Sequence, residues 1–155
     1  MAEIEIDRLI WIVTGVQLTA ELGDRPLAYR VEQAIRGHLA SLLDPPPEGE
    51  PPALAPAVIS DVYYLNHDAA QSRPTISIGG PGVNAVSAAW ANDLPTIVAI
   101  EDALVVQMDL EMNDRRCAVW GMDHVDTVRA VELFINKGYL ETFVTALAKE
   151  IRSAD

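Results

Sequence analysis

Short β-forming runs that end in glycine turns limit the folds open to this chain more than any other feature. Leu9–Val13 is continuously apolar and is closed by Thr14-Gly15. Such a run predicts a strand covered on both faces, as in the middle of an α/β sheet. Thr75–Ile78 and Cys117–Trp120 are also predicted strands, and each leads into a glycine turn and then into helical spacing. The chain therefore contains the strand–turn–helix units of an α/β protein.

Helical spacing fills the segments between these strands. Apolar residues recur at three- and four-residue steps over 27–42, and this helix should begin near Pro26 with Asp24 as its cap. It must end before Pro45, the first of several prolines in 44–56, a segment that we expect to be an extended surface connection. Further helices are predicted over 83–90, 128–135 and 140–151.

The strand pattern changes after Pro95. The runs 96–100, 104–110 and 117–120 are predicted strands, and their connections are too short for parallel crossovers, so they should form antiparallel hairpins. In the middle strand, polar Gln107 alternates with apolar neighbours, which predicts that one face of this strand is exposed to solvent.

These elements, together with a strand predicted over Ala57–Leu65, indicate the fold class. We expect a three-layer α/β sandwich, Rossmann-like, with a mixed and mostly parallel sheet of five or six strands and an antiparallel meander at one side. Residues 1–155 are enough for one domain with a buried core, and we expect a single domain.

The turn Gly79-Gly80-Pro81-Gly82 lies between a predicted strand and a predicted helix. Glycines let a ligand approach the backbone, and the start of a helix presents unpaired N–H groups with a partial positive charge. Asn84 is placed to hydrogen-bond a ribose or a phosphate. We therefore expect a site for a nucleotide or another small anion at Gly79, Gly80, Gly82 and Asn84. The alternative is a tight turn in which the glycines serve backbone geometry alone.

The run Ile76–Asn84 resembles the Gly-Gly-Pro turns of some Rossmann-like nucleotide-binding proteins. This resemblance covers roughly a tenth of the chain and implies a nucleotide as the ligand. The glycine spacing differs from the G-x-G-x-x-G fingerprint, and no Lys-Ser/Thr pair follows as in a phosphate loop. The resemblance therefore assigns no particular cofactor.

A second glycine turn, at Gly121, precedes the helix of 128–135 and contains His124. Histidine titrates at about pH 6.5, which suits proton transfer. Asp123 is either a helix cap or a partner of His124, and Asp61 interrupts a predicted apolar strand, where a carboxylate must be paired or face solvent. An alternative function is therefore an enzyme, of hydrolase or glycosyl-transfer type, that uses His124 with Asp123 or Asp61. We expect no metal ion, because no second histidine stands at a ligand spacing.

The charge of the chain restricts its partners. A net charge of −12 opposes binding to nucleic acid and to anionic membranes, because both require basic surface. The acidic segment 1–7 differs from a signal peptide, and 9–13 is far shorter than the roughly 20 residues of a membrane span, so we expect a cytoplasmic protein. A third function remains open: exposed hairpins in 96–120 and an amphipathic C-terminal helix would suit a homodimer or a protein partner.

Overall fold

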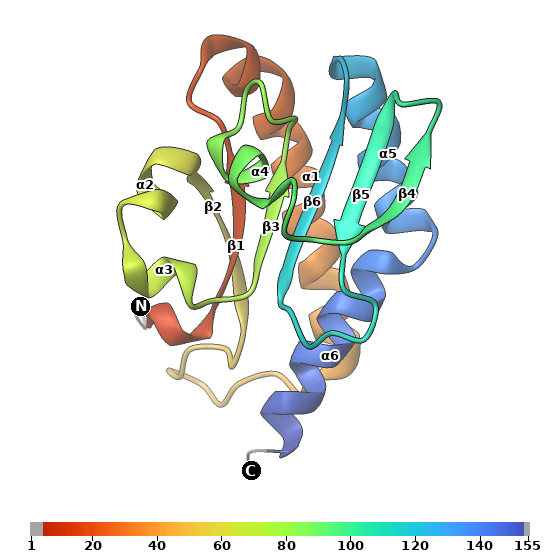
Figure 1. Ribbon diagram of the computed structural model, residues 1–155. Helices are drawn as coiled ribbons and strands as arrows, with labels where there is room; N and C mark the ends of the chain where they lie inside the picture. The colour runs from red at the N-terminus through yellow and green to blue at the C-terminus, as the bar shows by residue number, and fades with distance from the viewer. Residues whose placement is uncertain (1–4, 154–155) are drawn as a thin grey trace.

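A six-stranded mixed sheet lies between two layers of helices in the computed structural model, which describes residues 5–153 (Figure 1). The strands are β1 (Leu9–Thr14), β2 (Ala55–Ser60), β3 (Thr75–Ile78), β4 (Thr96–Ile100), β5 (Leu104–Met108) and β6 (Arg116–Gly121). Their order across the sheet is β2-β1-β3-β6-β5-β4. The first four strands in this order are parallel, and β5 and β4 run antiparallel to their neighbours. The predicted fold class, including the antiparallel meander, is confirmed.

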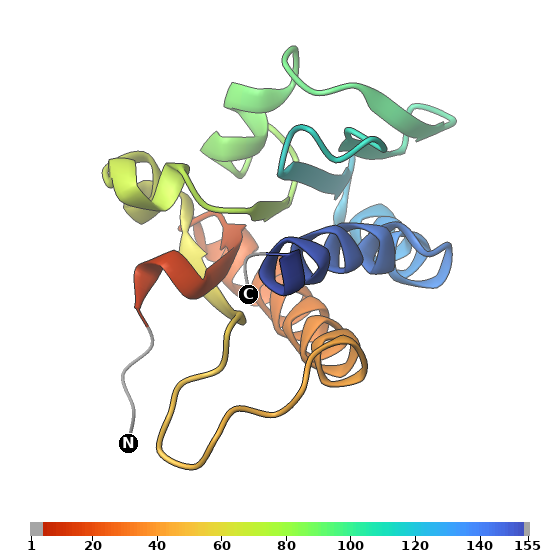
Figure 2. The ribbon, with the colours of Figure 1, turned by 90° about the horizontal axis from the view of Figure 1, so that it is seen from below.

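The helices cover both faces of the sheet (Figure 2). One layer contains the three long helices α1 (Leu18–Leu42), α5 (His124–Asn136) and α6 (Tyr139–Ser153). The other contains the short helices α2 (Asp61–Leu65), α3 (Asp68–Gln71) and α4 (Ala85–Trp90), and a 3-10 turn, Ile6–Arg8, precedes β1. Successive residues of a strand point to opposite faces, so β1 sends Ile10 and Ile12 into the core under the long helices, and Trp11 and Val13 into the core under the short ones. Because all of them are buried, β1 is covered on both faces, as predicted.

Helix α1 begins at Leu18, so the predictions that it starts near Pro26 and that Asp24 caps it were wrong. Pro26 lies inside the helix and has no N–H to donate to the carbonyl of Leu22. This interruption lies on the exposed side of the helix, where Leu22 itself is 73% exposed. As a result, Asp24 belongs to the second turn of the helix and is only 7% exposed.

The segment Asp61–Leu65, for which the sequence predicts a strand, is helix α2. Ser60 starts it, because its Oγ accepts the N–H of Tyr63 at 3.1 Å. This cap and the contacts of the segment outweigh the strand preference of its valine and tyrosines. The prediction that Asp61 lies within a strand is therefore wrong: β2 ends just before it.

The middle strand of the meander is covered on both faces at Gln107, where the sequence predicts solvent exposure. The Gln107 amide donates to the carbonyls of Ala91 at 2.9 Å and Leu94 at 3.1 Å. These carbonyls follow α4, so the segment between α4 and β4 covers this face and accepts both hydrogen bonds of the amide nitrogen. No helix within residues 5–153 is long and apolar enough to cross a membrane.

Candidate functional site

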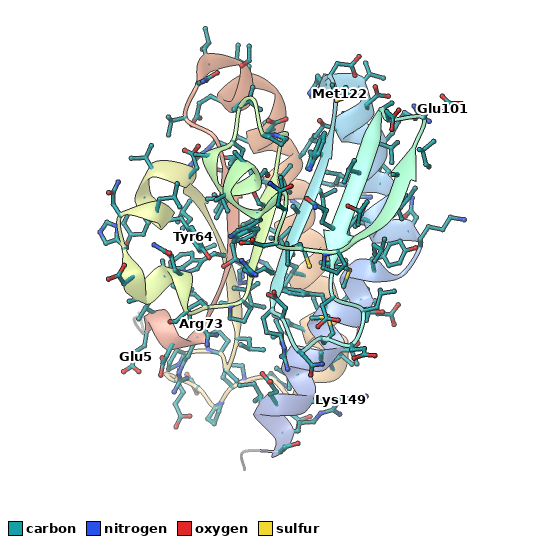
Figure 3. The ribbon with its side chains drawn as sticks, viewed as in Figure 1. Glu5, Tyr64, Arg73, Glu101, Met122 and Lys149 are labelled. Atoms are coloured by element: carbon teal, nitrogen blue, oxygen red, sulfur yellow. The ribbon has the colours of Figure 1, made fainter. Side chains whose placement is uncertain are left out.

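The carboxyl ends of β1, β3 and β6 lie next to one another at the upper edge of the sheet in Figure 1. The first glycine turn leaves β3 at this edge, and the second leaves β6. Since β3 and β6 are neighbours, the two turns are adjacent in space although they are distant in sequence. Figure 3 shows Met122, in the second turn, at this edge of the molecule. Carboxyl edges of parallel strands are the places where ligands bind in open α/β sheets.

A pocket of about 170 Å³ lies between the two turns and the first turns of α1. We call it the edge pocket. It is lined by Thr19, Ala20, Asp24, Gly80, Gly82, Val83, Gly121, Met122, Asp123, His124 and Thr127. It is smaller than the roughly 300–1,000 Å³ of pockets that enclose drug-sized ligands, so its size suits a small molecule or one end of a longer one.

The first turn supplies the floor of the edge pocket. Gly79 has a φ of +110°, a conformation that side chains with a Cβ rarely adopt. Gly80 lies against the indole of Trp120, where an added Cβ would be 3.4 Å from the ring. Gly80 and Gly82 both line the pocket, so two of the predicted ligand-binding glycines face the space in which a ligand would lie.

Asn84 does not line the edge pocket and is only 1% exposed. Its Nδ2 donates to the carbonyls of Val13 at 3.1 Å and Ile78 at 3.0 Å, which ties the turn to two strands. Its Oδ1 accepts the N–H groups of Val86 and Ser87 and so caps α4. All the hydrogen-bonding positions of this amide are therefore used within the protein.

The carboxylate of Asp61 also has a structural role, because both of its oxygens accept backbone N–H groups. One carboxylate oxygen accepts the N–H of Val62 at 2.8 Å, and the other accepts the N–H of Ala85 at 2.9 Å. Together with the cap from Asn84, this satisfies every amide in the first turn of α4. The place where a phosphate would meet the start of this helix is thus taken by an internal carboxylate.

The second turn forms the opposite wall. At Gly121, an added Cβ would be only 2.3 Å from the carbonyl carbon of Asp126, so the strand and helix approach too closely for any larger residue. Thr127 closes the turn, because its Oγ accepts the Gly121 N–H at 3.0 Å and donates to the Asp123 carbonyl at 3.0 Å. The Asp123 carboxylate caps α5 by accepting the N–H of Asp126 at 2.8 Å. Asp123 therefore has the capping role that the sequence allowed.

Asp24 is the carboxylate of the edge pocket that is best placed to bind a ligand. It is buried, and within residues 5–153 its carboxylate has neither a hydrogen bond nor an ion pair. Burial raises the pKa of Asp24, and the positive charge of His124 partly opposes this by lowering it. The His124 ring packs against Gly23, where an added Cβ would be 2.8 Å from Nδ1. The edge pocket thus contains a buried, unpaired carboxylate that interacts electrostatically with a nearby imidazole.

The sequence pattern predicts Asp24 only as a helix cap. A signal for its burial was present: Asp24 continues the spacing of the buried face of α1, four residues after Ala20 and four before Ala28. A carboxylate within an apolar stripe requires a partner or a function. The signal was hidden because the helix was expected to begin after this position.

Within residues 5–153 the structure shows neither a cluster of metal-ligating side chains nor an accessible thiol. Among residues 5–153, no group of three or more His, Cys, Asp or Glu side chains is placed to hold a metal ion. Cys117 is fully buried in β6, and burial raises the pKa of its thiol far above the ordinary value. A thiol in this state is not a nucleophile at neutral pH.

Two of the larger hollows lie away from the carboxyl edge of the parallel strands. One, of about 420 Å³, lies under the proline-rich connection and is lined mainly by aliphatic and proline side chains. The other, of about 450 Å³, lies at the opposite edge of the sheet and contains Arg115 and Arg116. These two guanidinium groups form ion pairs with Glu150 and Asp114, respectively, and these carboxylates partly neutralise their charge.

The fold and the site define an α/β protein with a mixed sheet, compatible with a Rossmann-like architecture, and a small pocket at the carboxyl edge. Compared with known families and with curated proteins, the chain matches neither a family nor a curated sequence. Its function must therefore be inferred from the residues of the edge pocket.

Proposed function

We propose that this chain is a small-molecule-binding domain whose ligand occupies the edge pocket. The observation that carries the proposal is the convergence of two separate glycine turns and one buried, unpaired carboxylate, Asp24, on a single pocket. A lone buried carboxylate lowers the stability of the folded chain, and a bound ligand would compensate it. The position, at the carboxyl edge of parallel strands, is where α/β sheets bind ligands.

Two classes of ligand belong in a screen. The resemblance of Ile76–Asn84 favours a nucleotide or another small anion, and the carboxylate of Asp24 favours a ligand that donates hydrogen bonds. Thermal-shift measurements against nucleotides, sugars, amino acids and amines will separate these classes. A ligand at about 100 times its Kd stabilises the folded state by about 2.7 kcal/mol. For a domain of this size, such stabilisation raises Tm by several degrees.

Substitution of Gly82 by leucine tests whether binding occurs in the edge pocket. An added Cβ at Gly82 meets no atom within 4 Å, so Gly82→Leu should fold and should fill the pocket mouth. Gly37→Leu is the matched control, because this glycine is equally unobstructed and lies on α1 away from the pocket. We expect ligand-induced stabilisation to be lost in Gly82→Leu and kept in Gly37→Leu. Equal stabilisation of both variants would place the ligand elsewhere and end the proposal.

A second candidate function, an enzyme using His124, is favoured by the proximity of Asp24 to this imidazole. Asp123 and Asp61, the carboxylates first considered as partners of His124, both accept backbone N–H groups. Asp24 is therefore the better acid–base partner. A panel of ester, phosphate and glycoside substrates tests this function: a turnover that falls at least a hundredfold in His124→Ala supports it, and unchanged turnover contradicts it. A homodimer or protein partner remains a separate prediction, which sedimentation of the full chain will test.

A further inference from the structure

The chemistry of the edge pocket indicates which ligand group it would hold. Among residues 5–153, no lysine or arginine lines it. The first amides of α4 are satisfied by Asp61 and Asn84, and Asp123 caps α5. An anion in this pocket would meet the uncapped backbone N–H groups at the start of α1 but no cationic side chain, and it would lie beside the carboxylate of Asp24.

A cation would find the opposite environment. Asp24 offers carboxylate oxygens that are unpaired within the described part of the chain. The net charge of −12 adds a long-range attraction for positively charged molecules. An ammonium group, which donates three hydrogen bonds, fits these acceptors.

The two segments that flank the pocket carry exposed apolar side chains. Five large hydrophobic side chains on the two segments that flank it are exposed to solvent: Val16, Leu18, Leu22, Met122 and Val125. Met122 lines the pocket itself, Leu22 precedes the glycine that contacts the His124 ring, and Val125 follows His124. We call these five residues the apolar rim. Exposed apolar side chains on the segments that form a pocket favour a ligand that carries an apolar group.

We infer that the edge pocket binds the ammonium group of an aliphatic primary amine, with Asp24 as its counter-charge and the apolar rim in contact with its chain. This inference rests on the proposed small-molecule function. The same ammonium chemistry occurs in a free alkylamine and in a lysine side chain, and a comparison of the two as probes distinguishes these sources.

The test is a titration of the full, isotopically labelled chain followed by backbone amide NMR signals. The probes are hexylamine, which is charged at pH 7, and hexanol and hexanoate, which have the same chain length with no charge or a negative one. We expect hexylamine to shift the signals of Gly80, Gly121 and Thr127, and the two other probes to bind more weakly. A capped lysine that binds more tightly than hexylamine identifies a lysine side chain as the source, and the reverse order identifies a free amine.

Variants at Asp24 decide whether its charge is responsible. Asp24→Asn keeps the shape of the side chain and should weaken hexylamine binding about tenfold or more. Glu141→Gln, which removes the same charge from the exposed face of α6, should bind as the unmodified chain does. Far-UV circular dichroism of both variants verifies that they are folded.

The outcomes separate the two proposals. Equal hexylamine binding by Asp24→Asn and the unmodified chain overturns the inference. Shifts of the same pocket signals by hexanoate or a nucleotide, with none by hexylamine, also overturn it but leave the small-molecule function standing. If none of the three probes and none of the nucleotides, sugars, amino acids and amines of the thermal-shift screen shifts these signals, both proposals fail.

Discussion

Asp24 and Gly79 are packed so closely that a Cβ on the glycine would be 2.6 Å from the Oδ2 atom of the aspartate. One residue lies on the second turn of α1, and the other directly follows β3. Only glycine accepts both this contact and a φ of +110°. The first glycine turn therefore has a specific purpose in this fold: it lets a buried carboxylate lie over the end of the sheet, beside the edge pocket.

Replacement of Asp24 by asparagine should stabilise the unliganded chain. Burial raises the pKa of Asp24, so the folded state binds this proton more tightly than the unfolded chain does. Ionisation therefore lowers stability as pH rises from the unfolded-state pKa, about 3.9, through the raised folded-state pKa. We expect Asp24→Asn to gain about 1 kcal/mol at pH 7, or roughly 2–4 °C in Tm, and to gain nothing below about pH 3.9.

Urea denaturation of both proteins between about pH 3.5 and 8 measures this gain. Glu141→Gln, which removes an exposed carboxylate, is the control and should change stability little. A loss of stability in Asp24→Asn at pH 7 would mean that the carboxylate has a stabilising partner, contrary to its unpaired position.

Substitution of Gly121 by alanine should destabilise the fold. Its Cβ would lie 2.3 Å from the carbonyl carbon of Asp126, so α5 would have to move away from β6, at a cost of about 1–3 kcal/mol. Gly37→Ala should instead stabilise by about 0.5–1 kcal/mol, because this helical glycine has no neighbour within 4 Å. Thermal unfolding of the two variants should give opposite shifts, and shifts of the same sign would contradict this packing.

Substitution of Asn84 by aspartate should destabilise by about 2–4 kcal/mol at pH 7. The new carboxylate keeps the cap of α4 but lies against the carbonyls of Val13 and Ile78, to which the amide donated. Asn92→Asp makes the same chemical change at an exposed position and should have little effect. Chemical denaturation will measure both variants, and equal midpoints would show that the amide donors of Asn84 contribute nothing.

The ion pair between Asp114 and Arg116 should make the stability of the fold decrease at low pH. Arg116 donates to both carboxylate oxygens of Asp114, at 2.9 and 2.8 Å, and this hydrogen bonding lowers the pKa of Asp114. The pair therefore stabilises the fold above the unfolded-state pKa of about 3.9, and its contribution disappears as pH falls through the lowered folded-state pKa. Asp114→Asn should lose about 1 kcal/mol at pH 7 and almost nothing near pH 2, as measured by urea denaturation. A loss that is equally large at both pH values would exclude the ion pair as its cause.

The amino-acid sequence alone determined the sheet class and most of the strands. Leu9–Val13 is an apolar run and Thr75–Ile78 is rich in β-branched residues, and this strand preference does not depend on distant residues. The short connections between β4, β5 and β6 permit only hairpins, so the antiparallel meander was also predictable. Both glycine turns, and the expectation of a ligand site near them, come from the same local patterns.

Tertiary structure alone decided the roles of the carboxylates. Asp61 became a helix residue because Ser60 caps α2, and it satisfies the start of α4 because the amide of Ala85, distant in sequence, lies within hydrogen-bonding distance. Asp24 became the unpaired group of the edge pocket because α1 starts before Pro26 and packs over Gly79. The environment of a charged group is set by whichever backbone and side-chain groups surround it in space, and local sequence does not contain that information.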